Sequence, residues 1–461
     1  MLKRIILNER YHIFCLISLC FIWLISLSIN FPIPLSPIFF ALLASFSTLK
    51  LLFFKEPLSP LRNRFFILIA INYFLFLVPA AEQIIFHPKD LANNSLISPI
   101  LRGFVFLMTL TIMLKFNLRF SMSSLRKLLI FSGTLISSIS LLRLIHLYFF
   151  SPAIASSNYT SSLIIDYNYF TIPILLGVIS ILATPPAQFK KTHGLLLIIM
   201  SMAVYLSFSR RAFLILNLAL AGSLLLNIKS NLKRSAFISL ILLLATPLVN
   251  PNFMQATYKS IFASMGGKPD IWNQYSGIYY YRYIRIFGEN VSIDKIRNDR
   301  TQISYVNLKL DFNFNPFRVI PTILPPTITP DLESQSYDSG GRIERWIFAG
   351  HLFKNYDLTK KLIGNGFSYL TLFKEKFFPQ GTADYPHLLG ASVLLYSGLI
   401  GLFFFSCLLF QSFRQLIQER RYYMLSLSIT VLAMIVASMN TPFDSYVQLM
   451  IFALPLFVGE S

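Results

Sequence analysis

Long apolar runs recur from one end of the chain to the other, and they constrain its fold more than any other feature. A helix needs about 20 mostly apolar residues to cross the hydrocarbon core of a bilayer. Runs close to that length lie at residues 12–29, 34–54, 65–80, 96–114, 128–150, 169–184, 193–208, 211–227, 235–249, 387–411, 422–438 and 445–459. They predict an all-α polytopic membrane protein with about 12 transmembrane helices.

The composition excludes a soluble protein. Hydrophobic residues make up 55% of the 461 residues, and charged residues only 13%. Soluble domains carry roughly 25% charged residues, so lipid must solvate most of this chain. The formal net charge of +20 does not indicate nucleic-acid binding, because nearly half of the basic residues lie in short connections between apolar runs. The three cysteines lie inside such runs and offer neither a disulfide framework nor a metal-binding spacing.

Basic residues are concentrated in every second connection, and this alternation predicts the orientation. Positive charges that flank membrane helices stay on the cytoplasmic side. With the N-terminus in the cytoplasm, nineteen of the forty Lys and Arg lie on that side. They are Lys3, Arg4, Arg10, Lys50, Lys55, Arg62, Arg64, Lys115, Arg119, Arg126, Lys127, Lys190, Lys191, Lys229, Lys233, Arg234, Arg414, Arg420 and Arg421. Both termini are therefore predicted to be cytoplasmic.

One long hydrophilic segment, residues 250–386, separates the ninth apolar run from the tenth. It predicts three parts: transmembrane helices 1–9 (residues 1–249), a large loop on the non-cytoplasmic side, and transmembrane helices 10–12 (residues 387–461). The loop holds sixteen basic and twelve acidic residues, but long translocated segments are largely exempt from the charge rule. Its proline-rich stretch at 316–330 predicts extended backbone.

Arg210 and Arg211, in the sequence SFSRRAF, lie in a tight turn between the seventh and eighth runs, on the predicted outer side. Two arginines there oppose the preference of positive charge for the cytoplasm. Guanidinium groups match phosphate oxygens in bidentate geometry, so one interpretation is an anion-binding site. The alternative is that the pair reaches out to the phosphates of membrane lipids.

Three further polar residues lie inside apolar runs: Arg102 in the fourth, and Arg143 and His146 in the fifth. From the rise of a helix, Arg102 lies roughly 9 Å and Arg143 roughly 10 Å below the outer end of its run. No acidic residue occurs in the middle of either run. The two arginines are expected either to reach headgroups or backbone carbonyls, or to line an outward-facing anion-binding pocket.

The sequence SGGRIERWIFAGHLF in the long loop predicts an amphipathic helix with Asp338 or Ser339 as its N-cap. Its apolar residues at helical spacing are Ile343, Trp346, Ile347 and Phe353. This face is expected to lie against the membrane surface or against the rest of the loop. Arg342 and Arg345 lie one turn apart and can project together, unless Arg345 pairs with Glu344 or Asp338 instead.

Pro386 and His387 stand where the long loop re-enters the membrane. A histidine at the mouth of a helix can act as a general base near neutral pH, and it can equally be a hydrogen-bonded structural residue. Gly390, Gly398 and Gly401 follow, and they predict close helix packing in the tenth run.

In this order and topology, these features resemble the O-antigen polymerase/ligase superfamily of bacterial inner membranes. The resemblance covers most of the chain as a topology and four short segments as sequence. SRRAF is similar to the family's Ser-Arg turn and GGRIERW to its Gly-Arg…Trp motif, which match Arg210 and Arg342 to family arginines. LIGNGF (residues 362–367) is similar to a Gly-x-Gly segment that follows. PHLLGASVLLYSGLIG is similar to the Pro-His-Asn…Gly-Leu-Ile-Gly segment, which matches His387, but Leu388 stands where asparagine is usual.

The resemblance implies metal-independent glycosyl transfer on the periplasmic face of the bacterial inner membrane, in O-antigen or other surface polysaccharide biosynthesis. The donor would be an undecaprenyl-diphosphate-linked oligosaccharide, and the lipid diphosphate would leave. The catalytic residues would be His387, Arg342 and Arg210. The residues that bind the diphosphate or glycan would be Arg211, Arg345, Arg102 and Arg143.

No nucleotide-binding motif and no acidic cluster for a metal occurs in the sequence, so no cofactor is expected. The expected partners are the lipid-linked donor, a glycan or lipid A–core acceptor, the lipid bilayer and a chain-length regulator. Nucleic acid is not among them.

Several functions stay open. A polymerase, which joins one lipid-linked repeat to another, is favoured because the long loop could hold a growing chain. An O-antigen ligase, which moves finished glycan to lipid A–core, is the alternative within the family. A flippase or transporter of lipid-linked oligosaccharides is an alternative of another class, although such proteins usually keep functional polar residues near the bilayer midplane. An assembly partner without chemistry would leave the outward arginines unexplained.

Overall fold

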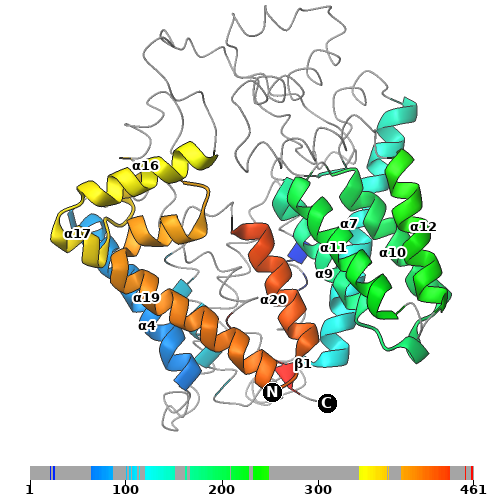
Figure 1. Ribbon diagram of the computed structural model, residues 1–461, viewed down its shortest axis with the longest axis horizontal. Coiled ribbons are helices and arrows are strands. Elements are labelled where there is room, and N and C mark those ends of the chain that lie inside the picture. Colours follow the sequence, from blue (N-terminus) through cyan, green and yellow to red (C-terminus); the bar gives the residue numbers. More distant parts are fainter. Residues whose placement is uncertain are drawn as a thin grey trace, which may run out of the picture. The chain divides into compact units, whose positions relative to one another are not determined.

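The computed structural model is mostly helical and forms two compact units (Figure 1). The residues that the structure describes are 21, 24–25, 64–86, 100, 103–104, 106–108, 110–111, 114, 120–150, 161–163, 167–207, 209–227, 232–248, 342–370, 372, 386–436, 452 and 458–459.

Three of the described helices are long and apolar enough to cross a membrane. They are α4 (Arg64–Phe86), α7 (Met122–Phe150) and α19 (Leu389–Gln418). Five shorter helices coincide with other predicted apolar runs. They are α9 (Tyr167–Leu182), α10 (Lys191–Tyr205), α11 (Arg210–Asn227), α12 (Leu232–Leu248) and α20 (Tyr422–Ile435). The chain is therefore a helical membrane protein.

Eight of the predicted apolar runs correspond to these helices. The other four runs, at 12–29, 34–54, 96–114 and 445–459, lie wholly or largely outside the described residues. The proline-rich stretch at 316–330 also lies outside them. The number of twelve spans, the side of both termini and the side of the long loop therefore stay predictions.

One unit contains most of α7 together with α9, a short 3-10 turn at Pro186–Gln188, α10, α11 and α12. Helix α9 packs against α10 and α11, and α12 packs against the same two helices. Most of α9 is buried, since every residue from Phe170 to Ile181 is buried. The unit is thus a bundle built around α9.

Helices α7 and α9 of this bundle approach each other closely at Gly133 and Gly177. A Cβ atom added to Gly177 would lie 3.0 Å from the carbonyl oxygen of Leu129 and 3.4 Å from the Cα of Gly133. It would also meet the sulfur of Met200 at 2.8 Å. Small residues allow backbones in a membrane to come this near, and van der Waals packing then holds them.

The other unit contains α4, α19 and α20, together with two helices from the predicted long loop, α16 (Arg342–Asn355) and α17 (Leu358–Ile363). Helix α19 packs against all four of these helices, and α17 also touches α4. Figure 1 shows the yellow α16 and α17 lying against the orange α19 and the blue α4. Two short strands, β1 (Phe120–Ser121) and β2 (Val458–Gly459), pair in parallel in the same unit.

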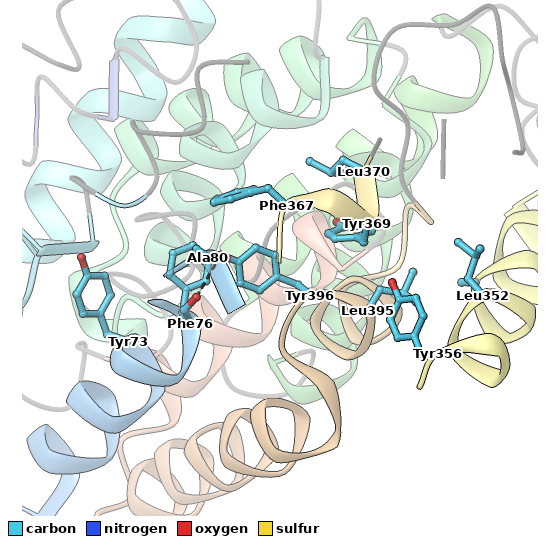
Figure 2. Packing of buried hydrophobic residues seen from close by; sticks show 11 residues of the cluster. Tyr73, Phe76, Ala80, Leu352, Tyr356, Phe367, Tyr369, Leu370, Leu395 and Tyr396 are labelled. Atoms are coloured by element: carbon cyan, nitrogen blue, oxygen red, sulfur yellow. Dashed lines mark hydrogen bonds between the residues drawn. The ribbon is translucent and has the colours of Figure 1, made fainter. Parts of the chain in front are cut away.

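Aromatic rings fill the core of this unit (Figure 2). Tyr396 of α19 stacks on Phe76 of α4 with 4.7 Å between ring centroids, and Phe367 meets Tyr396 edge-on at 5.0 Å. The Tyr396 hydroxyl donates a hydrogen bond to the carbonyl oxygen of Phe76 at 3.1 Å. The segment after α17 is therefore fixed to two membrane helices.

The predicted helix is confirmed as α16, and its predicted apolar face is described only at Trp346 and Phe353. Ala349, Leu352 and Tyr356 point into the core, and Phe353 packs partly against it. Trp346, which was expected on the same face as Phe353, is 38% exposed. The core is filled from the C-terminal half of α16, and Trp346 near its start is left exposed.

Gly177→Val should destabilise the protein, because the branched side chain must push α7 and α9 apart or displace Met200. Overpacking of this kind costs about 1–3 kcal/mol, and the melting temperature of the detergent-solubilised protein should fall. Gly222→Val on α11 is the matched control, since a Cβ at Gly222 meets nothing within 4 Å. Equal melting temperatures for the two variants would contradict the close approach.

Candidate functional site

The turn that carries Arg210 and Arg211 is held in place by Ser209. The Ser209 hydroxyl accepts a hydrogen bond from the backbone N–H of Ala212 at 3.2 Å, which makes it the N-cap of α11. The same hydroxyl donates to the side-chain oxygen of Asn168 on α9 at 2.9 Å. Sequence reasoning singled out the arginines and missed this serine, although a serine directly before a helical run is itself a capping signal.

Arg210 and Arg211 are the first two residues of α11, and the first turn contains no acidic residue. The N-terminus of a helix carries partial positive charge and exposes unpaired N–H groups. Two arginines add to that charge where an acidic residue would stabilise the helix. An anion bound there would relieve the repulsion, and helix N-termini are common anion sites.

Arg143 lies at the same end of this unit. It is 1% exposed, and its Nη1 donates to the carbonyl oxygen of Ser162 at 3.3 Å. The neighbouring Ser161 donates its backbone N–H to the carbonyl of Leu206 at 2.9 Å, three residues before Ser209. The expected bond from Arg143 to a backbone carbonyl is confirmed, and a role in anion binding stays a prediction.

His387 lies in the unit around α19, just before that helix. Its backbone has φ 52°, a left-handed conformation that a residue with a side chain adopts at a cost. Leu388 is the N-cap of α19 and offers no side-chain cap. The N–H of Leu389 instead donates to the carbonyl of Val436, at the end of α20, at 2.7 Å.

Arg342 is the first residue of α16, and Arg345 follows one turn later. Because α16 packs against α19, the helix that carries both arginines is attached to the helix that starts just after His387. Burial raises the pKa of the Tyr356 phenol at the end of α16, and the Asn365 side chain opposes this shift.

Helix α19 is broken at Gly398, which has φ 66° and ψ −165°. In an unbroken helix the carbonyls of Leu395 and Tyr396 would accept from the N–H groups four residues later. Here they accept from the N–H groups of Asn365 and Gly366, at 3.0 and 2.9 Å. The LIGNGF segment thus provides backbone donors for the break in α19.

Two glycines make this docking possible. A Cβ at Gly364, whose φ is 85°, would collide with the carbonyl group of Tyr396, and one at Gly398 would collide with the carbonyl group of Leu362. The predicted close packing at Gly398 is therefore confirmed, and the neighbour is the end of α17. Gly390 lacks such a neighbour, since a Cβ there meets nothing within 4 Å, and at that position the packing prediction is wrong.

The predicted site residues fall in both units. Arg143, Arg210 and Arg211 belong to the unit around α9, whereas Arg342, Arg345 and His387 belong to the unit around α19. Arg102 lies outside the described residues. In the part of the chain that the structure describes, no group of three or more His, Cys, Asp or Glu could hold a metal ion.

No protein-family model matches the chain, and neither the curated proteins nor the solved structures contain a significant match.

Gly398→Ala should destabilise the docked segment, because alanine at positive φ costs roughly 1–2 kcal/mol and its Cβ collides with Leu362. The melting temperature should fall, and proteolysis between α16 and α19 should become faster. Gly390→Ala in the same helix is the control and should be neutral or slightly stabilising, since alanine is the better helix former. If both variants behave alike, the break does not depend on Gly398.

Proposed function

We propose that this protein is a glycosyltransferase of the outer face of a bacterial inner membrane. It would transfer a saccharide from undecaprenyl diphosphate to a sugar acceptor in surface polysaccharide biosynthesis. The observation that carries the proposal is the convergence of three short segments in one unit. RIERW of the first segment begins α16, LIGNGF docks into the break in α19, and PHLLGASVLLYSGLIG contains the start and the break of α19 itself. These are three of the four segments on which the family resemblance rests.

The proposed reaction is a direct displacement at the anomeric carbon. The acceptor hydroxyl oxygen forms the new bond to that carbon as the bond to the diphosphate oxygen breaks, and the lipid diphosphate leaves with the bonding electrons. His387 takes the proton from the acceptor hydroxyl, which is general base catalysis. The configuration at the anomeric carbon is inverted.

Arginines would stabilise the negative charge that develops on the leaving diphosphate. Arg210 and Arg342 are assigned this role, with Arg211 and Arg345 in support, because guanidinium groups bind phosphate oxygens in bidentate geometry. The support for Arg210 is electrostatic, since it adds charge to the positive end of α11 and stands against the predicted orientation rule. A bound anion would offset the positive charge that gathers at this end of the helix.

Polymerase activity is preferred to ligase activity on one ground, the length of the loop between the ninth and tenth predicted spans. A flippase is the candidate of another class. A flippase would differ from both enzymes because it would move the lipid-linked saccharide across the bilayer without forming a new glycosidic bond.

His387→Ala and Arg210→Ala should each abolish polysaccharide synthesis. The protein is expressed in strains that lack either the polymerase or the ligase, and the surface polysaccharide ladder is read on a gel. Loss of a base or of a charge-stabilising arginine typically lowers the rate about 100-fold or more, so the restored ladder should disappear. Lys191→Ala is the matched control for Arg210→Ala, because Lys191 is likewise the first residue of its helix, on the predicted cytoplasmic side.

Membrane levels of each variant are measured by immunoblot, so that loss of protein is not read as loss of chemistry. Rescue of the polymerase-deficient strain alone supports polymerisation, and rescue of the ligase-deficient strain alone supports ligation. Full activity of His387→Ala and Arg210→Ala in a rescued strain would overturn the catalytic assignment. Transport of the lipid-linked saccharide by the purified protein in vesicles, without glycan transfer, would favour the flippase.

A further inference from the structure

Helix α17 carries two exposed leucines and packs against the membrane helix α19. Leu358 is 73% exposed and Leu362 is 40% exposed. They lie four residues apart and therefore on one side of the helix, whereas Lys360 lies on the opposite side. Lys361 lies beside Leu358 by the same spacing, so the leucine side has one lysine at its edge and another behind it.

The surface next to Leu362 is that of a membrane-spanning helix. A Cβ at Gly398 of α19 would touch the backbone of Leu362, so the two segments are in direct contact. The residues after Gly398 are Leu399 and Ile400, and both are exposed apolar side chains of that span. Lipid must cover these side chains of α19, and α17 packs against the same span.

The depth of the contact with α4 leads to the same conclusion. Phe76 and Ala80 belong to the core against which α16 and the segment after α17 pack. They lie about 18 and 24 Å along α4 from Arg64, its first residue. The hydrocarbon core of a bilayer is about 30 Å thick, so this packing falls in the half of the bilayer farther from Arg64.

We propose that α16 and α17 form a hairpin that is seated in one leaflet of the bilayer. Leu358 and Leu362 insert among the acyl chains, and Trp346 lies at the level of the headgroups, where tryptophan is enriched. Lys354 in the last turn of α16 and Lys361 in α17 bind the phosphates of anionic phospholipids, together with Lys360, which also forms an exposed ion pair with Asp357 at 3.8 Å. The partner is a phospholipid leaflet, and this assignment does not depend on the reaction proposed above.

Fluorescence quenching in reconstituted vesicles tests the seating. The full chain has three tryptophans, Trp23, Trp272 and Trp346, and all are replaced by phenylalanine. Leu358→Trp or Leu362→Trp is then introduced singly, with Lys360→Trp as the matched control on the other side of α17. The vesicles contain phosphatidylcholine and phosphatidylglycerol with brominated acyl chains, which quench tryptophan only on contact.

Leu358→Trp and Leu362→Trp should be strongly quenched with blue-shifted emission, and Lys360→Trp should be quenched much less. Unquenched emission at positions 358 and 362, or equal quenching at all three positions, would overturn the seating. A variant that retains only Trp346 provides a second reading in an unaltered hairpin, where quenching by the bilayer is again expected. Its failure in a protein that elutes as a single species would equally count against the proposal.

The lysines are tested with the bromine on one lipid at a time. Brominated phosphatidylglycerol should quench Leu358→Trp more strongly than the same fraction of brominated phosphatidylcholine. Replacement of Lys354, Lys360 and Lys361 by glutamine should remove this difference while quenching itself persists. Equal quenching by the two lipids before the replacement would overturn the role of the lysines.

Discussion

A bilayer offers no water to backbone groups, and the unit around α19 is organised by that constraint. Where Gly398 interrupts the helix, two carbonyl groups lose their partners, and each such group left unpaired in lipid costs several kcal/mol. Asn365 and Gly366 supply the missing donors. The break in α19 therefore needs the docked segment to supply donors. The docked segment in turn binds only because the break leaves these carbonyl groups open. Through this joint, α16 and α17 are attached to the helix that begins directly after His387.

Buried guanidinium groups in the other unit likewise form hydrogen bonds with backbone carbonyl groups. Arg143 donates to the carbonyl of Ser162. Arg234 donates to the carbonyls of Leu182 and Thr184 at the end of α9, and its guanidinium lies 5.0 Å from the centroid of the Phe189 ring. Cations at a helix C-terminus are stabilised by its dipole, so Arg234 serves the packing of the bundle. An arginine inside a membrane protein is thus not in itself a binding site. The pair at the start of α11 differs because it lies at the positive end of a helix, where a bound anion would be stabilised.

The helices could be predicted from the sequence, because the hydropathy of a run reports how lipid solvates it regardless of its neighbours. The break at Gly398 could not, because it depends on Asn365 and Gly366, more than thirty residues away in the chain. A glycine in a span reads equally well as a packing contact, a break or an open position, and Gly398 and Gly390 show two of these outcomes. The face of α16 was uncertain for a related reason. Its apolar residues surround much of the helix, and only the shape of the partner decides that Leu352 is buried and Trp346 is not.

The hydrogen-bonded contact at Gly398 also bears on how the protein would bind a lipid-linked substrate. A diphosphate attached to a membrane lipid is confined to the headgroup level, so cationic groups that bind it must be held at that level. Loops in water cannot fix such a depth, whereas a hairpin joined to a spanning helix by backbone hydrogen bonds can. Helix α16 starts with Arg342 and ends in the core formed with α4 and α19. The start of α16 is therefore carried by a helix whose other end is anchored among membrane spans. This arrangement suits chemistry on a lipid diphosphate better than transport across the midplane, which would require polar groups deeper in the bilayer.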